Sequence, residues 1–371
     1  MNRENEKIAA LEAQDNLRRL LDTDSRGAFV TFKGKEYVNL SSNDYLGLSG
    51  SALQDEFMEE LPRERFLMSN PASRLMTGNG PDYARLENSL AKLYGTEAAL
   101  VLGSGYLLNS GLPRAVADKG DLIVADKLVH ASMIDGISLA EAEHARFRHN
   151  DMAHLEGILK KSTGKYQRVM VMTDSLFSMD GDKAPLADLA LLQHKYGFHL
   201  YLDEAHAFGI CGPGGRGLAA GYNETAMLPL RVDYLVATLG KALASQGAFV
   251  ICDGVTRELL VNRMRTLIFS TALPPISLLW SDFLIKRLPG MGNLRTHLRK
   301  LVELLEGQSQ IIPVMAGSNR RALEMAKEFR QAGYWTTAIR HPTVPEGAAR
   351  IRLSLTAALT EKQILDFRKL L

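Results

Sequence analysis

Short apolar runs of strand length recur along the first three-quarters of this chain, and stretches with helical spacing separate them. Helices that cross over a parallel sheet cover both of its faces, so its strands read as continuous apolar runs rather than alternating ones. The pattern therefore predicts an α/β fold with a mostly parallel central sheet covered by helices. The strands that we expect are residues 98–104, 121–126, 168–174, 199–205, 233–239 and 247–253.

A region of different composition follows the motif "STALPP" at residues 270–275. Helical spacing continues to about Glu306, and then "IIPVMAG", a helix over 318–332, "YWTTAIR" and "ARIRLSL" indicate a smaller α+β domain. At the other end, "EKIAALEAQDNLRRLLD" has helical spacing, and "YVNLSSNDYLGLS" is typical of a strand running into a loop. We expect an N-terminal segment over 1–40, a large domain over 41–275 and a small C-terminal domain over 276–371.

Charge and cysteine content exclude several classes of protein. The 371 residues include 44 basic and 42 acidic side chains spread along the chain, which indicates no polyanion-binding face. Cys211 and Cys252 lack the paired spacing of a disulfide framework or a zinc site, and this suits a reducing compartment. The first residues lack the apolar core of a signal peptide, and no stretch is long and apolar enough to span a bilayer. These features favour a cytoplasmic protein.

The residues that directly follow the expected strands carry most of the chemistry-bearing side chains. In an open α/β sheet the ligand binds at the carboxyl ends of the strands, so these segments are expected to meet. They would bring together glycines and hydroxyl groups with Asp203, two histidines and Lys241, and they show no metal triad. The segments are "GSGY" (103–106), "ADKLVHAS" (125–132), "TDSLFSMDGD" (173–182), "DEAHAFG" (203–209) and "TLGK" (238–241).

These side chains match the needs of pyridoxal 5′-phosphate. Lys241 lies among small or apolar residues in "LVATLGKALASQG", where a low dielectric favours the neutral amine that can form a Schiff base. Asp203 would hold a pyridinium nitrogen protonated and so make the ring an electron sink, and His206 could reach the ring's phenolic oxygen. Residues 103–106 begin a helix after a strand, where free backbone N–H groups favour phosphate.

Several motifs have a plainer interpretation. Taken alone, Asp203 is equally typical of a helix N-cap, and His130 of a packed or surface histidine. The segment "GPGGRG" (212–217) fits the dinucleotide pattern G-x-G-x-x-G, but it follows a loop and no clear helix is expected after it, so we interpret it as a turn. "GKA" at 240–242 lacks the other residues of a P-loop. The histidines at 144, 149 and 154 lack acidic partners at ligand spacing, which favours a solvated face.

Six blocks together resemble the α-oxoamine synthases, fold-type I pyridoxal-phosphate enzymes that condense an amino acid with an acyl-CoA. The resemblance extends from about Leu17 to the C-terminus. The blocks occur in the family's order, so they are more specific than any single motif. They are "SSNDYLGL", "FSMDGDKAPL", "DEAHAFGICGPGGRG", "TLGKALASQGAF", "STALPP" and "HPTVPEGAARIRLSLTAA".

The resemblance implies roles for individual residues. Lys241 would carry the Schiff base and then act as general base, Asp203 and His206 would contact the ring, and His130 would stack on it and lie at the substrate. Arg352 would hold the amino-acid carboxylate, because its fork meets a carboxylate in two parallel bonds. Further implied cofactor contacts are Gly105, Tyr106, Ser178 and Thr238, together with Ser270 and Thr271, which would reach a neighbouring subunit's phosphate in a homodimer; further substrate contacts are Asn43, Arg18 at the acyl end, and Ser354 or Thr356.

Some positions depart from the family pattern, and they leave the acyl-chain preference open. Asn70 and Pro71 replace a turn rich in glycine and serine, and Tyr83, Asp174 and Leu359 stand where relatives usually have histidine, glutamate and histidine. We expect none of them to touch the bond-making residues. The last block favours alanine as the amino acid, with glycine plus acetyl-CoA or succinyl-CoA and serine palmitoyl transfer as alternatives. A pyridoxal-phosphate aminotransferase or lyase on the same fold, or a non-enzymatic module, would be a different class.

Overall fold

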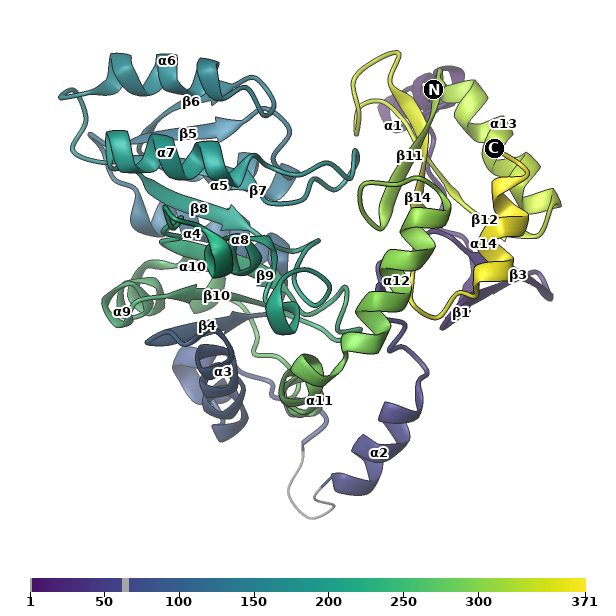
Figure 1. Ribbon diagram of the computed structural model, residues 1–371, viewed down its shortest axis with the longest axis horizontal. Coiled ribbons are helices and arrows are strands. Elements are labelled where there is room, and N and C mark those ends of the chain that lie inside the picture. Colours follow the sequence, from purple (N-terminus) through teal and green to yellow (C-terminus); the bar gives the residue numbers. More distant parts are fainter. Residues whose placement is uncertain (1, 62–66) are drawn as a thin grey trace. The chain divides into compact units, whose positions relative to one another are not determined.

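A computed structural model describes residues 2–61 and 67–371, and the chain divides into two compact units that we treat separately (Figure 1). Unit 1 comprises Met1–Ala52, Ser178–Gly181 and Asn293–Leu371, and unit 2 comprises Leu53–Phe177 and Asp182–Gly292. The names refer only to these groups of mutually contacting residues. The domain boundaries at residues 40 and 275 stay a prediction.

Unit 2 contains a seven-stranded sheet whose order is β4-β10-β9-β8-β7-β5-β6 (Figure 1). Strand β10 pairs antiparallel with both of its neighbours, whereas the other pairs are parallel. The prediction of a mostly parallel sheet is confirmed, and each of the strands expected from the sequence is present. The strands are β4 (Ala98–Leu102), β5 (Leu122–Asp126), β6 (Glu143–Phe147), β7 (Val169–Asp174), β8 (His199–Asp203), β9 (Tyr234–Thr238) and β10 (Ala248–Cys252).

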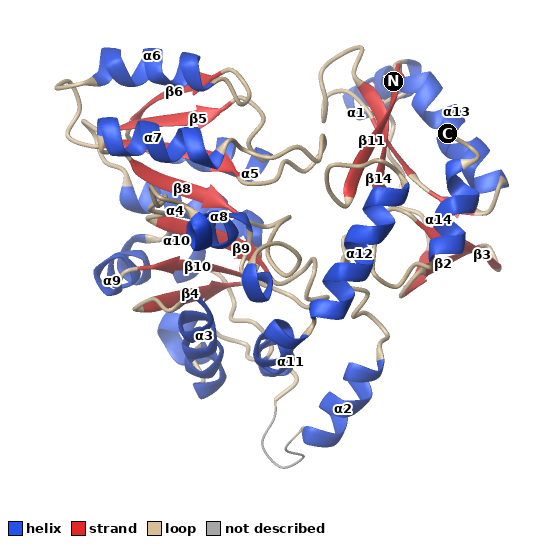
Figure 2. Ribbon diagram, viewed as in Figure 1, coloured by secondary structure: helices blue, strands red, loops and turns tan. Residues whose placement is uncertain are grey.

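Both faces of this sheet are buried, which explains why its strands read as continuous apolar runs. In β5, Leu122 and Val124 pack into one apolar cluster, and Ile123 and Ala125 pack into another on the opposite face. The first cluster includes side chains of α6 and α7, and the second includes side chains of α4 and α5. Figure 2 shows the helices of unit 2 arranged around the sheet. The helices with most of their residues in unit 2 are α2 (Ala52–Glu60), α3 (Pro81–Tyr94), α4 (Gly105–Val116), α5 (Ala131–Leu139), α6 (Met152–Ser162), α7 (Leu186–Tyr196), α8 (Leu218–Thr225), α9 (Gly254–Arg263), α10 (Arg265–Ile268) and α11 (Pro275–Arg287), with a π-helical turn over Arg74–Gly78.

Helices α4 and α5 approach each other closely at Gly136. A Cβ atom at this position would lie 2.2 Å from the backbone oxygen of Asn109, which is far inside normal contact. Only glycine allows the two backbones this separation. The close approach fixes α4, and with it the side chain of Asn109, relative to the start of α5.

Unit 1 is built from two smaller sheets. One has the order β1-β2-β3-β12, in which the last pair is parallel and joins the N-terminal and C-terminal parts of the chain. The other is antiparallel, with the order β11-β14-β13. The elements are β1 (Thr23–Arg26), β2 (Phe29–Phe32), β3 (Lys35–Asn39), β11 (Ile311–Gly317), β12 (Tyr334–Trp335), β13 (Thr337–Ile339), β14 (Ala349–Ser354), α1 (Arg3–Ala13), α12 (Gly292–Leu304), α13 (Asn319–Gln331) and α14 (Glu361–Arg368).

The N-terminal helix is shorter than its sequence pattern indicates. Helix α1 ends at Ala13, because Gln14 caps it and Asp15 adopts a left-handed backbone with φ of 54°. The expectation of helix as far as residue 22 was therefore wrong, and Arg18 lies in an irregular segment. In the described part of the chain no helix is long and apolar enough to cross a membrane.

Candidate active site

Lys241 lies in a tight turn directly after β9. The Ala244 N–H donates to the Lys241 carbonyl at 2.9 Å, and the Leu239 N–H donates to the Gly247 carbonyl at 2.9 Å. Ala244 adopts a φ of 42°, a left-handed conformation that larger side chains disfavour still more. The small residues around Lys241 therefore build the turn that holds the amine at the carboxyl end of the strand.

The Lys241 amine contacts His206, a pairing that the sequence did not predict. Its Nζ lies 2.8 Å from His206 Nε2, and His206 is buried. An ammonium group at this distance can donate only to an unprotonated ring nitrogen. The pair therefore combines one amine and one imidazole nitrogen that share a hydrogen bond.

Asp203 is the last residue of β8, and its carboxylate is buried. The Asn109 amide donates to Oδ2 at 2.8 Å, and the Ala205 N–H donates to Oδ1 at 2.8 Å. Asn109 is held in turn by Tyr201, whose hydroxyl donates to its amide oxygen. The site therefore offers a buried, hydrogen-bonded carboxylate at the end of β8.

Asp174 places a second carboxylate beside Asp203. The two residues face each other in register at the ends of β7 and β8. The pKa of Asp174 is raised well above its usual 3.8, first because burial disfavours its charge and then because Asp203 is close. The Asp174 carboxyl also accepts a hydrogen bond from the His130 N–H at 3.2 Å. The expectation that Asp174 lies away from the bond-making residues was therefore wrong.

His130 caps the N-terminus of α5. Its Nδ1 lies 2.7 Å from Ser132 Oγ and accepts from the Ser132 N–H at 3.3 Å, which leaves Nε2 as the protonated nitrogen of the neutral ring. Partial burial lowers the pKa of His130; the charge of Asp203 opposes this effect, whereas that of Lys241 adds to it. The site therefore holds a neutral imidazole here.

The N-terminus of α4 lies beside Thr238. Helix α4 begins at Gly105, as predicted, and Ser104 caps it by accepting from the Leu107 N–H at 3.2 Å. A Cβ atom on Gly105 would lie 3.9 Å from Thr238 Cβ, so the helix start and the end of β9 are neighbours. Tyr106 is exposed, and its hydroxyl donates to Asp135. Helix N–H groups and a threonine hydroxyl are typical ligands of phosphate.

Ser270 and Thr271 lie on a segment that pairs with residues 72–73. Thr271 forms a single antiparallel bridge with Ser73, and the Ala272 N–H donates to the Ala72 carbonyl at 2.9 Å. The Tyr83 hydroxyl accepts from the Leu273 N–H at 2.7 Å. The unusual tyrosine therefore supports the segment that carries the two hydroxyl residues.

Arg352 is the centre of a group within unit 1. On β14, its Nε donates to the Ser178 carbonyl at 2.5 Å, and both terminal nitrogens lie 3.3 Å from Asn43 Oδ1. One of them also lies 3.4 Å from the Tyr45 hydroxyl. Burial raises the pKa of Tyr45 and the charge of Arg352 opposes this, so the phenol stays neutral. The structure thus brings together three residues that the resemblance assigns to substrate and cofactor, and it adds Tyr45.

The resemblance also assigns Arg18, and Ser354 or Thr356, to the substrate. Arg18 donates to Thr343 Oγ1 at 2.8 Å, and among the described residues no hydrogen bond joins it to Arg352. Ser354 lies on the same face of β14 as Arg352, two residues later, and is fully buried, as is Thr356. Their roles toward a substrate stay predictions.

The glycine-rich segment 212–217 precedes a helix, α8, and the expectation that no clear helix follows it was wrong. The helix start is occupied by the buried side chain of Glu204, which accepts from the Leu218 N–H at 3.0 Å and the Ala219 N–H at 2.8 Å. Gly217 has a φ of 98°, and a Cβ on it would lie 2.7 Å from the Glu204 carboxylate. The glycines therefore fit an internal carboxylate rather than a dinucleotide.

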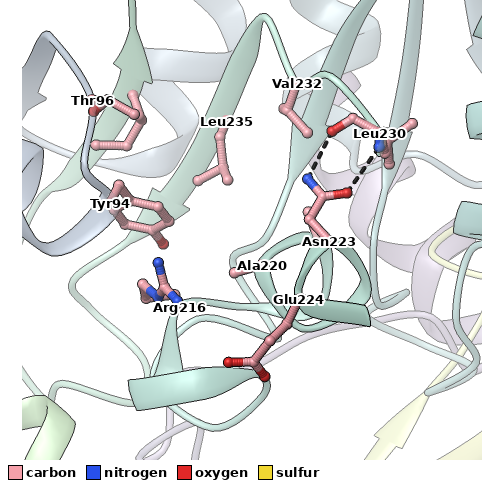
Figure 3. Close-up of a pocket in the computed structure, with 11 residues that line it drawn as sticks. Tyr94, Thr96, Arg216, Ala220, Asn223, Glu224, Leu230, Val232 and Leu235 are labelled. Atoms are coloured by element: carbon pink, nitrogen blue, oxygen red, sulfur yellow. Dashed lines mark hydrogen bonds between the residues drawn. The ribbon is translucent and has the colours of Figure 1, made fainter. Parts of the chain in front are cut away.

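A pocket of about 370 Å³ lies beside α8. Figure 3 shows Tyr94 and Arg216 pointing toward each other at one end, with Asn223 bonded to the backbone of Leu230 at the other. Burial raises the pKa of Tyr94 well above 10, and the charge of Glu204 adds to the effect. None of the residues predicted to be functional lines this pocket, so we do not place the active site there.

His149 also differs from its prediction. Instead of standing on a solvated face, its ring bridges two carboxylates, with Nδ1 3.0 Å from Asp126 and Nε2 2.8 Å from Asp182. The partners lie 23 residues before and 33 residues after the histidine, which is why local spacing did not reveal them.

Asn109 was likewise not predicted from the sequence, although it stands four residues after Gly105 on one helix face. In the described ranges no cluster of three or more ligating side chains is placed to hold a metal ion.

Comparison with known proteins matches the chain over nearly its whole length. The family model for aminotransferase class I and II covers residues 35–369. Proteins named 8-amino-7-oxononanoate synthase from Haemophilus ducreyi and Chlorobaculum parvum are 45% identical over 379 residues and 46% identical over 371 residues. The alignments cover 97% of this chain and 97% of the first relative, and 95% and 94% for the second. A solved lysine-to-alanine variant of serine palmitoyltransferase from S. paucimobilis with a bound PLP–myriocin aldimine has a TM-score of 0.90 at 25% identity, and the alignment covers 100% of this chain and 97% of that one.

The Glu204 cap can be tested by changing Glu204→Gln. The carboxylate accepts from Ser175 and from two backbone N–H groups, so one amide nitrogen would face a donor instead of an acceptor. We expect a loss of about 1–3 kcal/mol in the free energy of unfolding. Glu224→Gln on the exposed face of the same helix should change it by less than about 0.5 kcal/mol. Equal stabilities of the two variants in urea denaturation would contradict the capping role.

Proposed function

Because this chain belongs to the aminotransferase class I and II family and, within it, to the 8-amino-7-oxononanoate synthases, we propose that it condenses L-alanine with a pimeloyl thioester. The products are 8-amino-7-oxononanoate, carbon dioxide and the free thiol carrier, and the reaction serves biotin biosynthesis. The observation that carries the proposal is the Lys241 amine 2.8 Å from His206, on the same sheet edge as the buried Asp203.

Pyridoxal 5′-phosphate is the cofactor of this reaction, and the residues present fit it. Asp203 would hold the protonated ring nitrogen, His206 the phenolic oxygen, and Lys241 the aldehyde carbon. The start of α4 and Thr238 would hold the phosphate, with Ser178 and Tyr106 as further contacts. When bound, the cofactor supplies an electron sink for the bonds that break at the amino-acid α-carbon.

The protein's own side chains transfer the proton and orient the reacting groups. Lys241 Nζ removes the proton from the α-carbon of alanine and returns one to that carbon after carbon dioxide has left. His206 holds the amine through the shared hydrogen bond. His130, kept neutral beside Lys241, offers a flat imidazole face for stacking without adding a second positive charge.

Arg352 is the proposed ligand of the alanine carboxylate. Its Nε is fixed by the Ser178 carbonyl, whereas its two terminal nitrogens make long contacts, of 3.3 Å with Asn43 and 3.4 Å with Tyr45. A carboxylate that met both nitrogens would form stronger, charge-assisted bonds. Asn43 would then support the guanidinium or contact the substrate directly.

Loss of the lysine amine tests the proposal as a whole. The purified wild-type protein is expected to take up pyridoxal phosphate with a yellow absorption band, and to release carbon dioxide and free thiol from L-alanine and pimeloyl-CoA. Lys241→Ala should lose the band and at least about 1,000-fold in kcat, because it removes both the attachment and the base. Lys160→Ala, at an exposed lysine of α6, should keep both.

Other substrates decide between this reaction and its alternatives. Faster turnover of glycine with acetyl-CoA would favour another α-oxoamine synthase reaction. Amino-group transfer or elimination without release of free thiol would favour an aminotransferase or a lyase. A colourless protein that takes up no pyridoxal phosphate would contradict the whole scheme.

The role of Arg352 predicts a change in substrate affinity. Arg352→Lys keeps the positive charge but loses the planar fork, so the KM for L-alanine should rise about 10- to 100-fold. Arg321→Lys, on the exposed face of α13, should leave it unchanged. Steady-state kinetics with alanine as the varied substrate measure both, and an unchanged KM in Arg352→Lys would refute the assignment.

A homodimer with shared sites is part of the proposal. Ser270 and Thr271 adjoin Phe269, which is 70% exposed, and their bridge partner Ser73 adjoins the exposed segment that contains Met76. Apolar side chains gathered around two hydroxyl residues favour an interface where those hydroxyls reach the neighbouring subunit's phosphate. A cytoplasmic location accompanies this proposal, because both cysteines are free thiols.

Phe269→Glu tests the dimer. A carboxylate in the interface should shift sedimentation toward the monomer and weaken cofactor retention by about tenfold or more. Met227→Glu, at another fully exposed apolar position, should leave both unchanged. A wild-type protein that sediments as a monomer at micromolar concentration while fully active would exclude shared sites.

A further inference from the structure

The cluster around His149 lies at the carboxyl end of the unit 2 sheet and has no assigned role. Asp126 ends β5 and is fully buried, and His149 follows β6. Asn150, with a φ of 51°, donates its backbone N–H to Asp126 at 2.9 Å and its amide to Asp182 at 2.9 Å. The cluster thus ties two strand ends to Asp182, which belongs to the segment after β7.

The imidazole of His149 is a cation in this arrangement. Both ring nitrogens face carboxylate oxygens, which can only accept, so both must carry a hydrogen. Burial alone lowers the pKa of His149, but the hydrogen bonds to Asp126 and Asp182 outweigh it and raise the pKa to about 10. The rings of His149 and Phe177 also pack edge to face, with centroids 4.4 Å apart.

Asp182 closes the base of a strap, which we define as residues 176–183. The Phe177 N–H donates to the Asp182 carbonyl at 3.0 Å, and Leu176 and Lys183 form an antiparallel bridge. Asn150 reaches the same place, because its amide also donates to the Lys183 carbonyl at 3.2 Å. Both ends of the strap are therefore fixed by groups that contact His149 or its neighbour.

Residues in the middle of the strap contact the two arginines of β14, within unit 1. The Ser178 carbonyl accepts from Arg352 Nε at 2.5 Å, and Asp180 pairs with Arg350. Gly181 has a φ of 71°, and a Cβ on it would lie 2.0 Å from the Ile311 carbonyl oxygen. These contacts leave the strap little freedom to shift along β14 without moving the guanidinium of Arg352.

We propose that His149 is a positioning residue for amino-acid binding: it anchors Asp182 and so sets the strap whose Ser178 carbonyl orients Arg352. The inference rests on the proposed function, in which Arg352 receives the alanine carboxylate. His149 itself touches neither substrate nor cofactor. It acts through three contacts: His149 pairs with Asp182, the Phe177 N–H donates to the Asp182 carbonyl, and the carbonyl of the adjacent Ser178 accepts from Arg352.

His149→Gln tests this role. The glutamine amide has its donors on one nitrogen, so its carbonyl oxygen would face one of the two carboxylates and the strap base should loosen. The KM for L-alanine should rise about tenfold while kcat stays within about twofold, because the loss affects substrate orientation rather than the lysine base. His144→Gln, at an exposed histidine on the neighbouring β6, should leave both constants unchanged.

Asp182→Asn provides a second variant in case His149→Gln folds poorly. It removes the charge and keeps the shape, and it should raise the KM by a similar factor. The double variant should be no worse than either single one, since both remove the same contact. Additive effects, or a fall in kcat with unchanged KM, would overturn the proposal.

Two readouts do not depend on the acyl substrate. Amide hydrogen exchange at Phe177 and in strap residues 178–183 should be about tenfold faster in His149→Gln than in His144→Gln. Affinity for L-alanine, followed through the absorption of the bound cofactor, should fall as the KM rises. If the wild type binds alanine but makes no product from pimeloyl-CoA, the proposed reaction fails while these readouts still decide the role of His149; unchanged exchange and affinity would refute it.

Discussion

Asp174 and Asp203 end neighbouring parallel strands, directly opposite each other, and both side chains are buried. Two adjacent carboxylates cannot both carry a charge in such a place unless hydrogen bonds and a cation stabilise them. The surrounding residues supply such hydrogen bonds. Asn109 and the Ala205 N–H donate to Asp203, and the His130 N–H donates to Asp174. The positions of α4 and α5 follow, because they carry Asn109 and His130. A cationic ring bound at Asp203 would complete the same electrostatic balance.

Buried carboxylates recur at this edge of the sheet, each with a different partner. Glu204 accepts hydrogen bonds from the first N–H groups of α8. Asp126 accepts them from His149 and from the backbone of Asn150. Parallel strands bring their carboxyl ends to one edge, so acidic residues that end them must share it. A helix start stabilises Glu204, and an imidazolium stabilises Asp126. In the proposed function, Asp203 is the member of this set that meets a ligand.

The sequence was informative where chemistry and strand pattern coincide in one short segment. The strand runs located the sheet, and Lys241, Asp203 and His206 could be chosen because each follows such a run directly. Contacts between distant segments could not be found this way. Asn109 reaches Asp203 across 94 positions, and His149 meets Asp126 and Asp182 on either side of it in the chain. Helix α8 was missed because its start is stabilised by Glu204, which lies 14 residues earlier than Leu218 and carries no local capping signal.

The parallel pairing of β3 with β12 has a consequence for the order in which the protein forms during synthesis. Unit 1 needs residues from both ends of the chain, whereas unit 2 consists of residues that all emerge before Asn293. A growing chain can therefore assemble the seven-stranded sheet while the first 52 residues still wait for their partners. The ring of Tyr37 in β3 packs against Trp335, so it gains its full cover only after the later segment has been made. The ribosome, and any chaperone that attends it, thus meets an exposed N-terminal hairpin for most of the time that translation takes.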